Sequence, residues 1–396
     1  MLLVESNIDG TVGGSHQAMF DLVRNLDRGD FEPVALYYQD NRFADSMRAL
    51  GTEVHVWEDV AAHEWMQNEP STFPTKLRRR LGAITRRVRF LRAHRIALVH
   101  INNSPGSAWF DWLPASRLAG IPCVAHARSN NVTPVSAFQR LATRHYARVI
   151  AISNHVAKEL GRVGVPADEI QVVYDGIDEA SLRGAVHRDR ESVRRTLGVD
   201  ADKVMVAMVG HLRPWKGQHV VLEATRQLRP ELRDRLVVLF VGGTAADCED
   251  YARALRDTAA GAGLDGCVQF LGERTDVPEL MNASDVVLHA STVWEPFGLV
   301  VLEGMMLGKA VIASCLGGPS EVINEGSGIL FDPRVPSQLT SALESVITNE
   351  FLRSSLADRA RQRGREFSAR RMADQVQQVY RTALAGRGIT VSSERP

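Results

Sequence analysis

The feature that most constrains this fold is the alternation of short apolar runs with amphipathic, helix-like segments along nearly the whole chain. Such alternation is typical of parallel strands joined by right-handed helical crossovers. The sequence therefore predicts an α/β protein with two similar parallel sheets, one in each half. The predicted strands are Leu2–Glu5, Pro33–Tyr38, Glu53–Trp57, Ala97–Ile101, Pro122–Ala125, Val149–Ser153 and Gln171–Tyr174, then Val204–Val209, Leu236–Val241, Val268–Leu271, Val286–Ala290, Ala310–Ala313 and Gly328–Phe331.

The length of 396 residues exceeds what one hydrophobic core usually serves, which favours two domains. A polar and charged stretch without a strong apolar period, Asp178–Lys203, marks the predicted junction. After Phe331 the pattern predicts a helix over Pro336–Thr348 and later a polar, disordered tail over Thr390–Pro396. The predicted divisions are residues 1–178, residues 179–366, and residues 367–396 with a helix from about Ala369 to Leu384 that packs back on the first domain.

The amino-acid composition limits which cellular compartment and which binding partners we expect. Lys and Arg total 47, and so do Asp and Glu, so net charge favours neither nucleic acid nor an acidic ligand. The four cysteines form no C-x-x-C pair, which argues against a disulfide framework or a structural zinc site and favours a reducing compartment. No apolar stretch has the length of a signal peptide or of a membrane-spanning helix. We therefore expect a cytoplasmic protein, either soluble or peripheral on the inner face of a membrane.

The most informative segment runs from Glu295 to Ala313 and follows a predicted strand. Its apolar pattern over Leu299–Leu307 is helical, Gly308 is a typical helix stop, and the β-branched run that follows predicts the next strand. In open parallel sheets, ligands lie beyond the carboxyl ends of strands, where free N–H groups at helix N-termini favour phosphate. The residues at this predicted phosphate-binding helix start are Phe297, Gly298 and Leu299.

Two carboxylates flank this helix start, Glu295 in the loop and Glu303 in the helix. Carboxylates suit polyhydroxylated ligands because each oxygen accepts hydrogen bonds in two directions. The spacing allows one carboxylate to face a hexose while the other accepts hydroxyl bonds farther along a bound nucleotide. The alternative is structural, with Glu303 a solvated helix residue and Glu295 a helix-start carboxylate stabilised by the helix dipole.

Glu295 and Glu303, with seven residues between them, resemble the E-x7-E signature of retaining glycosyltransferases of family four. The surrounding E-P-F-G-L and L-E-G-M-M-L-G-K-A-V-I-A segments are similar to that family's. The resemblance implies the GT-B fold, in which two Rossmann-like domains face each other across a donor-binding cleft. It implies that Glu295 contacts the donor hexose and Glu303 the nucleotide ribose. It also implies that residues 1–178 bind the acceptor and residues 179–366 the nucleotide sugar.

The segment from Gly210 to Gln218 extends the resemblance, because the family places a basic pair here that neutralises the diphosphate leaving group. Lys216 matches the family lysine. Phosphates that gain charge as the glycosidic bond breaks need fixed cations, since this fold commonly works without a divalent metal, and no cofactor is expected. The sequence departs from the pattern at His211, where the family often has arginine, so Arg213 is the candidate second cation. The alternative is a plain surface turn at Lys216.

Three further segments resemble the family. Phe270–Leu280 is similar to the strand and loop that border the nucleobase, which makes Arg274 a candidate contact to the base or a phosphate. Gly317–Glu321 resembles the loop that closes over the donor. Tyr174–Asp178 corresponds to an N-G-I-D turn, with Asp175 in place of asparagine; both residues tolerate the turn geometry.

In the first half, the loop Asp9–Ser15 carries glycines that let the backbone approach a ligand closely. By resemblance this loop reaches the donor phosphate and the acceptor, so Gly13 and Gly14 are candidate donor-binding residues; a tight turn is the alternative. His126 follows a predicted strand and resembles the family histidine beside the hexose C6 hydroxyl and the reacting centre, although a lone histidine is usually structural. We do not expect it to be a simple general base. Retention in the family is generally explained by departure and attack on one face, with the leaving phosphate taking the acceptor proton.

A basic segment lies between positions 76 and 95, with one lysine and eight arginines, and no acidic residue occurs from Pro70 to Phe110. Such a basic amphipathic helix is a candidate for binding an anionic membrane surface or a lipid-linked acceptor. The alternative is that the apolar stripe packs on the sheet while the arginines are solvated. The apolar residues at helical spacing are Leu77, Leu81, Ile84, Val88 and Leu91.

Together these features predict a retaining hexosyltransferase that uses a nucleotide-diphosphate sugar and a glycan or lipid-linked acceptor in polysaccharide or glycolipid biosynthesis, without a nucleic-acid partner. Two alternatives stay open: a catalytically silent nucleotide-sugar-binding scaffold, which the departure at His211 keeps open, and a sugar-nucleotide epimerase or hydrolase on the same fold. A dinucleotide-binding oxidoreductase is disfavoured because no G-x-G-x-x-G opens a crossover. The divided site also predicts cleft closure on donor binding, with a hinge near Gly176.

Overall fold

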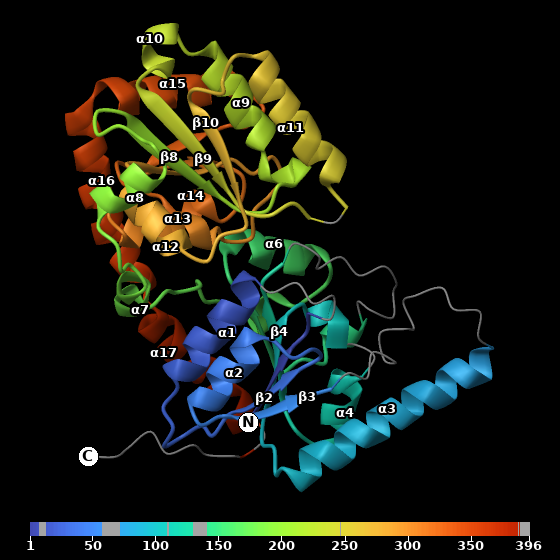
Figure 1. Ribbon diagram of the computed structural model, residues 1–396. Helices are drawn as coiled ribbons and strands as arrows, with labels where there is room; N and C mark the ends of the chain where they lie inside the picture. The colour runs from blue at the N-terminus through green and yellow to red at the C-terminus, as the bar shows by residue number, and fades with distance from the viewer. Residues whose placement is uncertain are drawn as a thin grey trace. The chain divides into compact units, whose positions relative to one another are not determined.

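A computed structural model describes residues 1–7, 13–57, 72–108, 111–129, 141–245, 247–386 and 388. The chain forms two compact units, which Figure 1 draws as ribbons. Unit 1 comprises Met1–Gly176 and Ala369–Pro396, and unit 2 comprises Ile177–Ser368. The sequence predicts the domain division after residue 178, and the structure has it after Gly176. The predicted tail over Thr390–Pro396 lies outside the described residues.

Unit 1 is built on a seven-stranded sheet in the order β3-β2-β1-β4-β5-β6-β7, and all its paired strands are parallel. Its central strands are buried on both faces, as expected where helices cover a parallel sheet. Their carboxyl ends therefore meet at one edge of the sheet. The strands are β1 (Leu2–Glu5), β2 (Val34–Tyr37), β3 (Glu53–Val56), β4 (Val99–Asn103), β5 (Cys123–Ala127), β6 (Arg148–Ala151) and β7 (Ile170–Val172).

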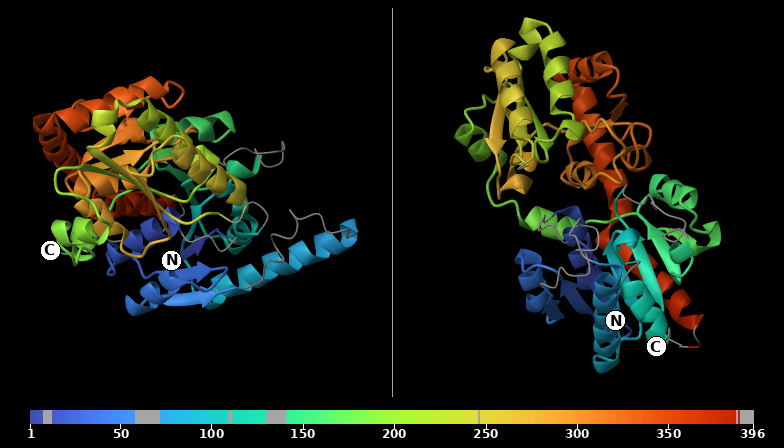
Figure 2. Two further views of the ribbon diagram at one scale, coloured as in Figure 1. Left: turned by 45° about the horizontal axis from the view of Figure 1, so that its top comes forward. Right: turned by 90° about the vertical axis from the view of Figure 1, so that its right-hand side faces the viewer.

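The last helix of the chain returns to unit 1, as the right-hand view of Figure 2 shows in red. It buries Met372, Val376 and Tyr380 in the core of this unit, and the Tyr380 hydroxyl lies 2.7 Å from His100 Nδ1. This helix is thus part of the core of unit 1. The helices of unit 1 are α1 (Gly14–Arg24), α2 (Arg42–Ala49), α3 (Phe73–Ala93), α4 (Trp112–Ala119), α6 (Asn154–Arg162) and α17 (Ala369–Ala385).

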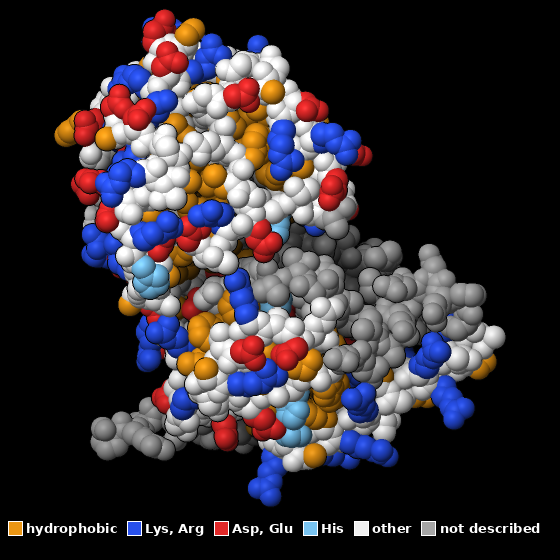
Figure 3. Space-filling view, viewed as in Figure 1, with side chains coloured by type: hydrophobic (Ala, Val, Ile, Leu, Met, Phe, Trp, Pro, Cys, Tyr) orange, Lys and Arg blue, Asp and Glu red, His pale blue; other side chains and the backbone are white. Residues whose placement is uncertain are grey.

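The basic segment forms helix α3, as predicted, but only part of its apolar stripe is buried. Ile84 and Leu91 are buried, whereas Leu77 is 42% and Leu81 55% exposed. The first turns of α3 extend away from the sheet in Figures 1 and 2, and Figure 3 shows Lys and Arg side chains along the helix. One arginine departs from the expectation of solvated charges, since Arg87 is fully buried beside Asp111. Within the described residues, no helix combines the length and apolarity needed to cross a membrane.

Unit 2 repeats the architecture with a six-stranded parallel sheet in the order β10-β9-β8-β11-β12-β13. Its strands are β8 (Val204–Val209), β9 (Leu236–Val241), β10 (Val268–Gly272), β11 (Val286–His289), β12 (Ala310–Ser314) and β13 (Ile329–Phe331). Its helices are α7 (Glu179–Gly184), α8 (Arg190–Thr196), α9 (Gln218–Gln227), α10 (Pro230–Arg233), α11 (Glu249–Gly261), α12 (Val277–Ala283), α13 (Leu299–Met306), α14 (Pro319–Val322), α15 (Pro336–Thr348) and α16 (Glu350–Gly364).

Each predicted strand overlaps an observed one, and the helix predicted over Pro336–Thr348 has these bounds. The prediction of only two helices after Phe331 is wrong, because α16 lies between them. Its buried positions are few and include Ala360 and Gly364, so the sequence has no continuous apolar stripe there. The polar stretch after Asp178 likewise contains two short helices that belong to unit 2.

Candidate active site

The loop after β8 carries Lys216 and is fixed at its end by Gly217. Gly217 has a φ of +81°, and a Cβ on it would lie 1.9 Å from the carbonyl oxygen of Ala290. Thr292 donates its backbone N–H to the Trp215 carbonyl at 2.8 Å. This loop is therefore attached directly to the carboxyl end of β11, and only glycine fits the contact.

The loop that carries Glu295 is held in the same way by two glycines after β12. Glu295 accepts the Gly318 N–H at 2.8 Å through its backbone carbonyl and donates its own N–H to Leu316 at 3.2 Å. A Cβ on Gly317 would lie 2.2 Å from the Glu295 carbonyl oxygen, and one on Gly318 would lie 2.3 Å from Phe297 Cα. The predicted donor-closing loop thus positions the Glu295 backbone in this structure.

Glu295 and Lys216 meet at the carboxyl edge of the unit 2 sheet. The Lys216 ammonium donates to Glu295 Oε2 at 3.0 Å. The same oxygen accepts the Ser291 hydroxyl at 3.0 Å and lies 3.1 Å from His289 Nε2. The Lys216 ammonium also lies 4.2 Å from the centre of the Trp215 ring, which adds a cation–π contact. One carboxylate oxygen is therefore the centre of a four-residue polar cluster.

This cluster keeps Glu295 ionised. Burial raises the pKa of its carboxyl, but the Lys216 charge and the hydrogen bonds from His289 and Lys216 outweigh burial and hold the pKa well below its usual range. For His289 to donate to the carboxylate, its proton must be on Nε2. The buried Nδ1 then has no hydrogen-bond partner among the described residues. The site combines a fixed anion with a partly exposed cation.

The start of α13 provides backbone donors beside this cluster. Gly298 is its N-cap residue with a φ of +92° and, as a glycine, has no side chain to cap the helix. A Cβ on Gly298 would lie 3.0 Å from Pro319 Cγ, so the approach of the two loops also favours glycine. Leu299 is the first residue of the helix, and the preceding Phe297 is buried. The uncapped N–H groups of the first turn suit a phosphate.

Two other predicted basic residues of unit 2 are paired with acidic side chains. Arg213 is ion-paired with Asp247 at 3.4 Å, and Arg274 donates two hydrogen bonds to Asp276 at 2.8 and 2.7 Å. Glu303 is on the second turn of α13 and is partly buried. In this conformation Arg213 does not join Lys216 as a second cation.

In unit 1, His126 lies on β5 and is fully buried. Its Nδ1 is 3.3 Å from Arg128 Nη2, and Nε2 has no hydrogen-bond partner in the described part of the chain. Burial, then the charge of Arg128, holds the pKa of His126 well below its usual range, so the ring is neutral. Gly13 and Gly14 form the start of α1, and the loop residues 8–12 lie outside the described ranges.

A polar network that the motif analysis missed surrounds Arg128 at the carboxyl edge of the unit 1 sheet. Arg128 donates to Asn102 Oδ1 at 2.8 Å and is ion-paired with Asp175. Asn102 donates in turn to Glu5 Oε2 at 2.6 Å. Arg128 and Asp175 are both buried, so the charge of Asp175, and not only its turn geometry, matters here. The signal in the sequence was a polar residue at the carboxyl end of each of three strands.

The fold places the chain in a known structural class. It is similar to the Anabaena protein Alr3699/HepE in complex with UDP, with 25% identity, a TM-score of 0.78, and coverage of 96% of this chain and 98% of that one. A complex of the same protein with UDP-glucose gives a TM-score of 0.77. A glycosyltransferase from Rickettsia africae, at 19% identity, has a TM-score of 0.80 over 97% of this chain and 98% of that one. The two parallel-sheet α/β units therefore form a GT-B fold.

Family models and curated relatives give the narrower assignment. The model "Glycosyl transferases group 1" matches residues 189–365, and "Glycosyltransferase Family 4" matches residues 12–181. The chain is also 36% identical over 224 residues to a D-inositol 3-phosphate glycosyltransferase of Saccharomonospora viridis, which covers 55% of this chain and 51% of that protein. The match thus spans about half the length of this relative. The chain belongs to the group 1, family-four glycosyltransferases.

Proposed function

We propose that this chain is a retaining glycosyltransferase that transfers a hexose from a nucleotide-diphosphate sugar to a glycan or lipid-linked acceptor. The observation that carries the proposal is the Lys216–Glu295 pair beside the uncapped start of α13. Membership of the group 1 family supports glycosyl transfer. The UDP and UDP-glucose complexes of the Anabaena protein support a nucleotide-sugar donor, with UDP as the first nucleotide to test.

The donor roles follow from the charges of the site. The first-turn N–H groups of α13 and the Lys216 ammonium bind the diphosphate, because an ammonium with three donors can hold Glu295 and a phosphate oxygen together. Glu295 accepts hydroxyls of the hexose and Glu303 those of the ribose. Arg274 reaches the base or a phosphate if it leaves Asp276. These groups offset the charge that develops on the leaving diphosphate, so this proposal includes no divalent metal in the reaction.

The reaction breaks the bond between the anomeric carbon and the diphosphate oxygen and forms a bond from the acceptor oxygen on the same face of the sugar. The leaving phosphate oxygen takes the acceptor proton. His126 is a weak base because its pKa is lowered by burial, so its proposed role is to hydrogen-bond the hexose. Gly13 and Gly14 would bring backbone close to the donor phosphate at the start of α1.

Thermal-shift titration of the full chain tests the donor site. We expect UDP and one UDP-hexose to stabilise the protein, by about 2.7 kcal/mol at one hundred times Kd, and GDP and ADP to do so less. Lys216→Ala should abolish the effect of both UDP and UDP-hexose. Glu295→Gln should selectively reduce the extra effect of the hexose. Arg334→Ala, which removes an exposed cation elsewhere on unit 2, is the matched control.

The same variants separate transfer from the alternatives. Incubation with a labelled UDP-hexose and candidate acceptors should yield a product whose anomeric configuration, read by NMR coupling constants, equals that of the donor. Inversion would contradict the retaining mechanism. Binding without turnover over a broad acceptor panel would contradict the enzyme and favour the scaffold. Altered free nucleotide sugar without acceptor would favour the epimerase or hydrolase.

The exposed part of α3 supports a membrane-surface acceptor. Leu77 and Leu81 are exposed on a helix rich in arginine, a combination that suits an interface with anionic lipid. We expect the chain to co-sediment with phosphatidylglycerol vesicles and not with neutral ones. Loss of two exposed charges in Arg78→Gln with Arg89→Gln should weaken binding by about 2 kcal/mol, or roughly thirtyfold, at low salt. Arg162→Gln, at another exposed position, is the control, and equal binding to neutral vesicles would contradict this part of the proposal.

A further inference from the structure

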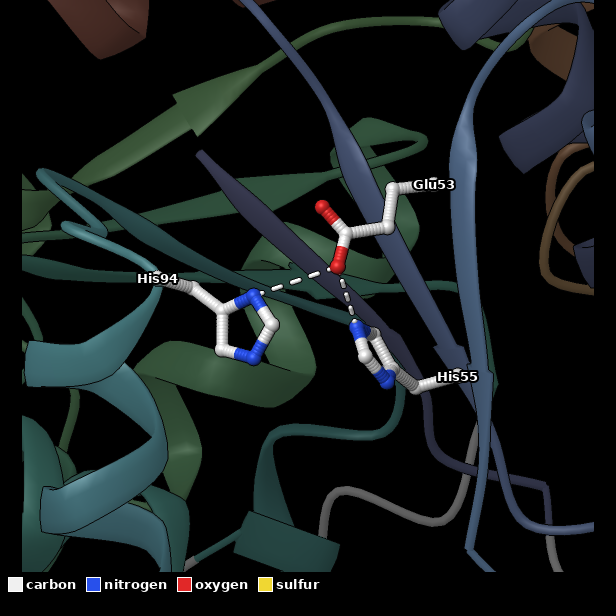
Figure 4. A group of neighbouring side chains, drawn as sticks. All are labelled: Glu53, His55 and His94. Atoms are coloured by element: carbon white, nitrogen blue, oxygen red, sulfur yellow. Dashed lines mark hydrogen bonds and ion pairs between the residues drawn. The ribbon is translucent and has the colours of Figure 1, made fainter.

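A cluster of metal-ligating side chains lies on unit 1, away from the residues that the proposed reaction uses. Figure 4 shows Glu53 between His55 and His94, with one carboxylate oxygen directed at both rings. Glu53 Oε1 is 2.7 Å from His55 Nε2 and 3.1 Å from His94 Nδ1. The three candidate ligand atoms all lie within 4.8 Å of one another.

The strand and helix periodicities bring these residues together. Glu53 and His55 are two positions apart on β3, so their side chains project from the same face of the edge strand. His94 is the C-cap residue of α3, with its backbone N–H bonded to the Phe90 carbonyl at 3.0 Å. The cluster therefore connects the last turn of α3 to the amino-terminal part of β3.

Aromatic packing orients both imidazoles before any ligand arrives. The Phe90 ring lies 4.9 Å from the His55 ring and 4.2 Å from the His94 ring, measured between centroids. Trp57, two residues beyond His55, also packs on Phe90, with 5.1 Å between the ring centroids. His55 and His94 are each about one-quarter exposed, at 27% and 29%, so an ion from solvent can reach them. Ligands held in this way lose little rotamer freedom on binding a metal.

We propose that Glu53, His55 and His94 bind a divalent transition-metal ion of the Zn²⁺ type. Two imidazoles and one carboxylate are a ligand set that zinc commonly takes, with a water in the fourth position. Tetrahedral coordination at bond lengths of about 2.0–2.1 Å requires ligand atoms about 3.3 Å apart. The separations of 2.7 and 3.1 Å from Glu53 Oε1 are shorter than this value, and all three ligand atoms lie within 4.8 Å of one another, so the side chains must rotate as the ion binds.

The position of the cluster indicates a stabilising role and not a catalytic one. His126, the unit 1 residue with a predicted catalytic role, lies near the carboxyl end of β5, whereas Glu53 begins β3. A bound ion would tie the end of α3 to the edge strand, where the partial negative charge of the helix C-terminus favours a cation. The arginines of α3 oppose a cation, and the Glu53 carboxylate is the ligand that offsets them.

Calorimetric titration of chelator-treated, full-length protein with zinc chloride tests the proposal. We expect saturable binding of one ion at this site. His94→Gln and Glu53→Gln should each weaken it at least tenfold, since even residues that only orient metal ligands typically cost about 10–100-fold. His187→Gln removes an exposed histidine of unit 2 and should leave this binding unchanged. Far-UV circular dichroism and urea unfolding of the metal-free variants establish that they are folded.

Two further readouts decide between a metal site and a hydrogen-bonded trio. Zn²⁺ should raise the melting temperature of the wild type and of His187→Gln but not of the two ligand variants. Co²⁺ bound in place of zinc should give visible absorption that is lost in the same two variants. Absence of saturable binding to the wild type, or binding unchanged in both ligand variants, would overturn the proposal.

Discussion

Glu5 is a fully buried carboxyl at the end of β1, and its substitution by glutamine gives a quantitative test of the unit 1 network. Burial raises the pKa of Glu5 from its ordinary value of 4.5 to about 7, even though Asn102 and the Asn7 N–H donate to it and Arg128 is near. Tyr37, whose pKa Glu5 helps to raise, is a further neighbour. Near neutral pH the folded protein therefore binds a proton here that the unfolded chain has released.

The sign and size of the effect follow from the two pKa values. Because the folded-state pKa is the higher one, the stabilisation is fully present below pH 4.5 and is lost as pH rises through 7. The difference between 7 and 4.5 corresponds to about 3.4 kcal/mol at 1.36 kcal/mol per pKa unit. Between pH 5 and pH 8, the Glu5 contribution should fall by about 2.5 kcal/mol, mostly below pH 7.

Urea unfolding of wild type and Glu5→Gln between pH 5 and pH 8 measures this contribution. The difference between the two proteins is the useful quantity, because His100 and His126 have lowered pKa values and destabilise unit 1 as pH falls in the same range. Glutamine cannot ionise, so the variant should gain about 2.5 kcal/mol relative to wild type on going from pH 5 to pH 8. Any effect of the glutamine amide on stability that does not depend on pH cancels when the values at pH 5 and pH 8 are subtracted.

Glu159→Gln is the matched control, since Glu159 pairs with an arginine that is 74% exposed. Its effect should stay below about 0.5 kcal/mol at every pH, as for most exposed ion pairs. A free-energy difference between wild type and Glu5→Gln that is constant from pH 5 to pH 8 would refute the reasoning, because Glu5 would then have the same pKa in both states.

Two further predictions concern single substitutions. Gly217→Ala should destabilise unit 2 by at least about 2 kcal/mol in urea and abolish UDP stabilisation, because its Cβ would overlap the Ala290 carbonyl and φ is +81°. Gly266→Ala, with open space around the new methyl group, should do neither. Asp175→Asn should cost unit 1 about 3 kcal/mol at pH 7, also read from urea unfolding, because Arg128 would keep its buried charge without a counterion. A loss below about 1 kcal/mol would show that the pair is not a significant electrostatic contributor.

The strands could be predicted almost completely because buried parallel strands are continuous apolar runs bounded by polar residues. The helices were predicted where an apolar face is continuous, as in α15 and α17, and missed at α16, where alanine and glycine form much of the packed surface. The basic segment was correctly predicted as a helix, but sequence could not separate its exposed residue Leu81 from its buried residue Leu91. That difference depends on how far the helix extends beyond the sheet.

Lys216 and Glu295 were both predicted as donor-site residues from their motifs, but the ion pair between them was not predicted, because it depends on β8 and β11 being neighbours in the sheet. His289 and Ser291 were not anticipated, although they lie two residues apart at the end of β11 and lead directly to Glu295. The feature of the sequence that could have indicated them is the change from apolar to polar residues at the end of this strand. Arg213 shows the limit of such reasoning, since its nearest counterion, Asp247, is set by the fold and not by the motif.

Asp175 and Glu5 are coupled through the residues between them, and this yields a last prediction. Arg128 pairs with Asp175 and binds Asn102, which in turn binds Glu5, so one buried cation faces two acids. Burial raises the pKa of Asp175, whereas Arg128 favours its ionised form. The ionised Asp175 balances the Arg128 charge, and Glu5 retains its proton to about pH 7. In Asp175→Asn the unbalanced cation should favour ionised Glu5 and lower its pKa. With Asp175 present, Glu5→Gln should gain about 2.5 kcal/mol of unfolding free energy relative to its parent between pH 5 and pH 8. In the Asp175→Asn background this gain should be much smaller. An unchanged gain would show that the two carboxyls titrate independently.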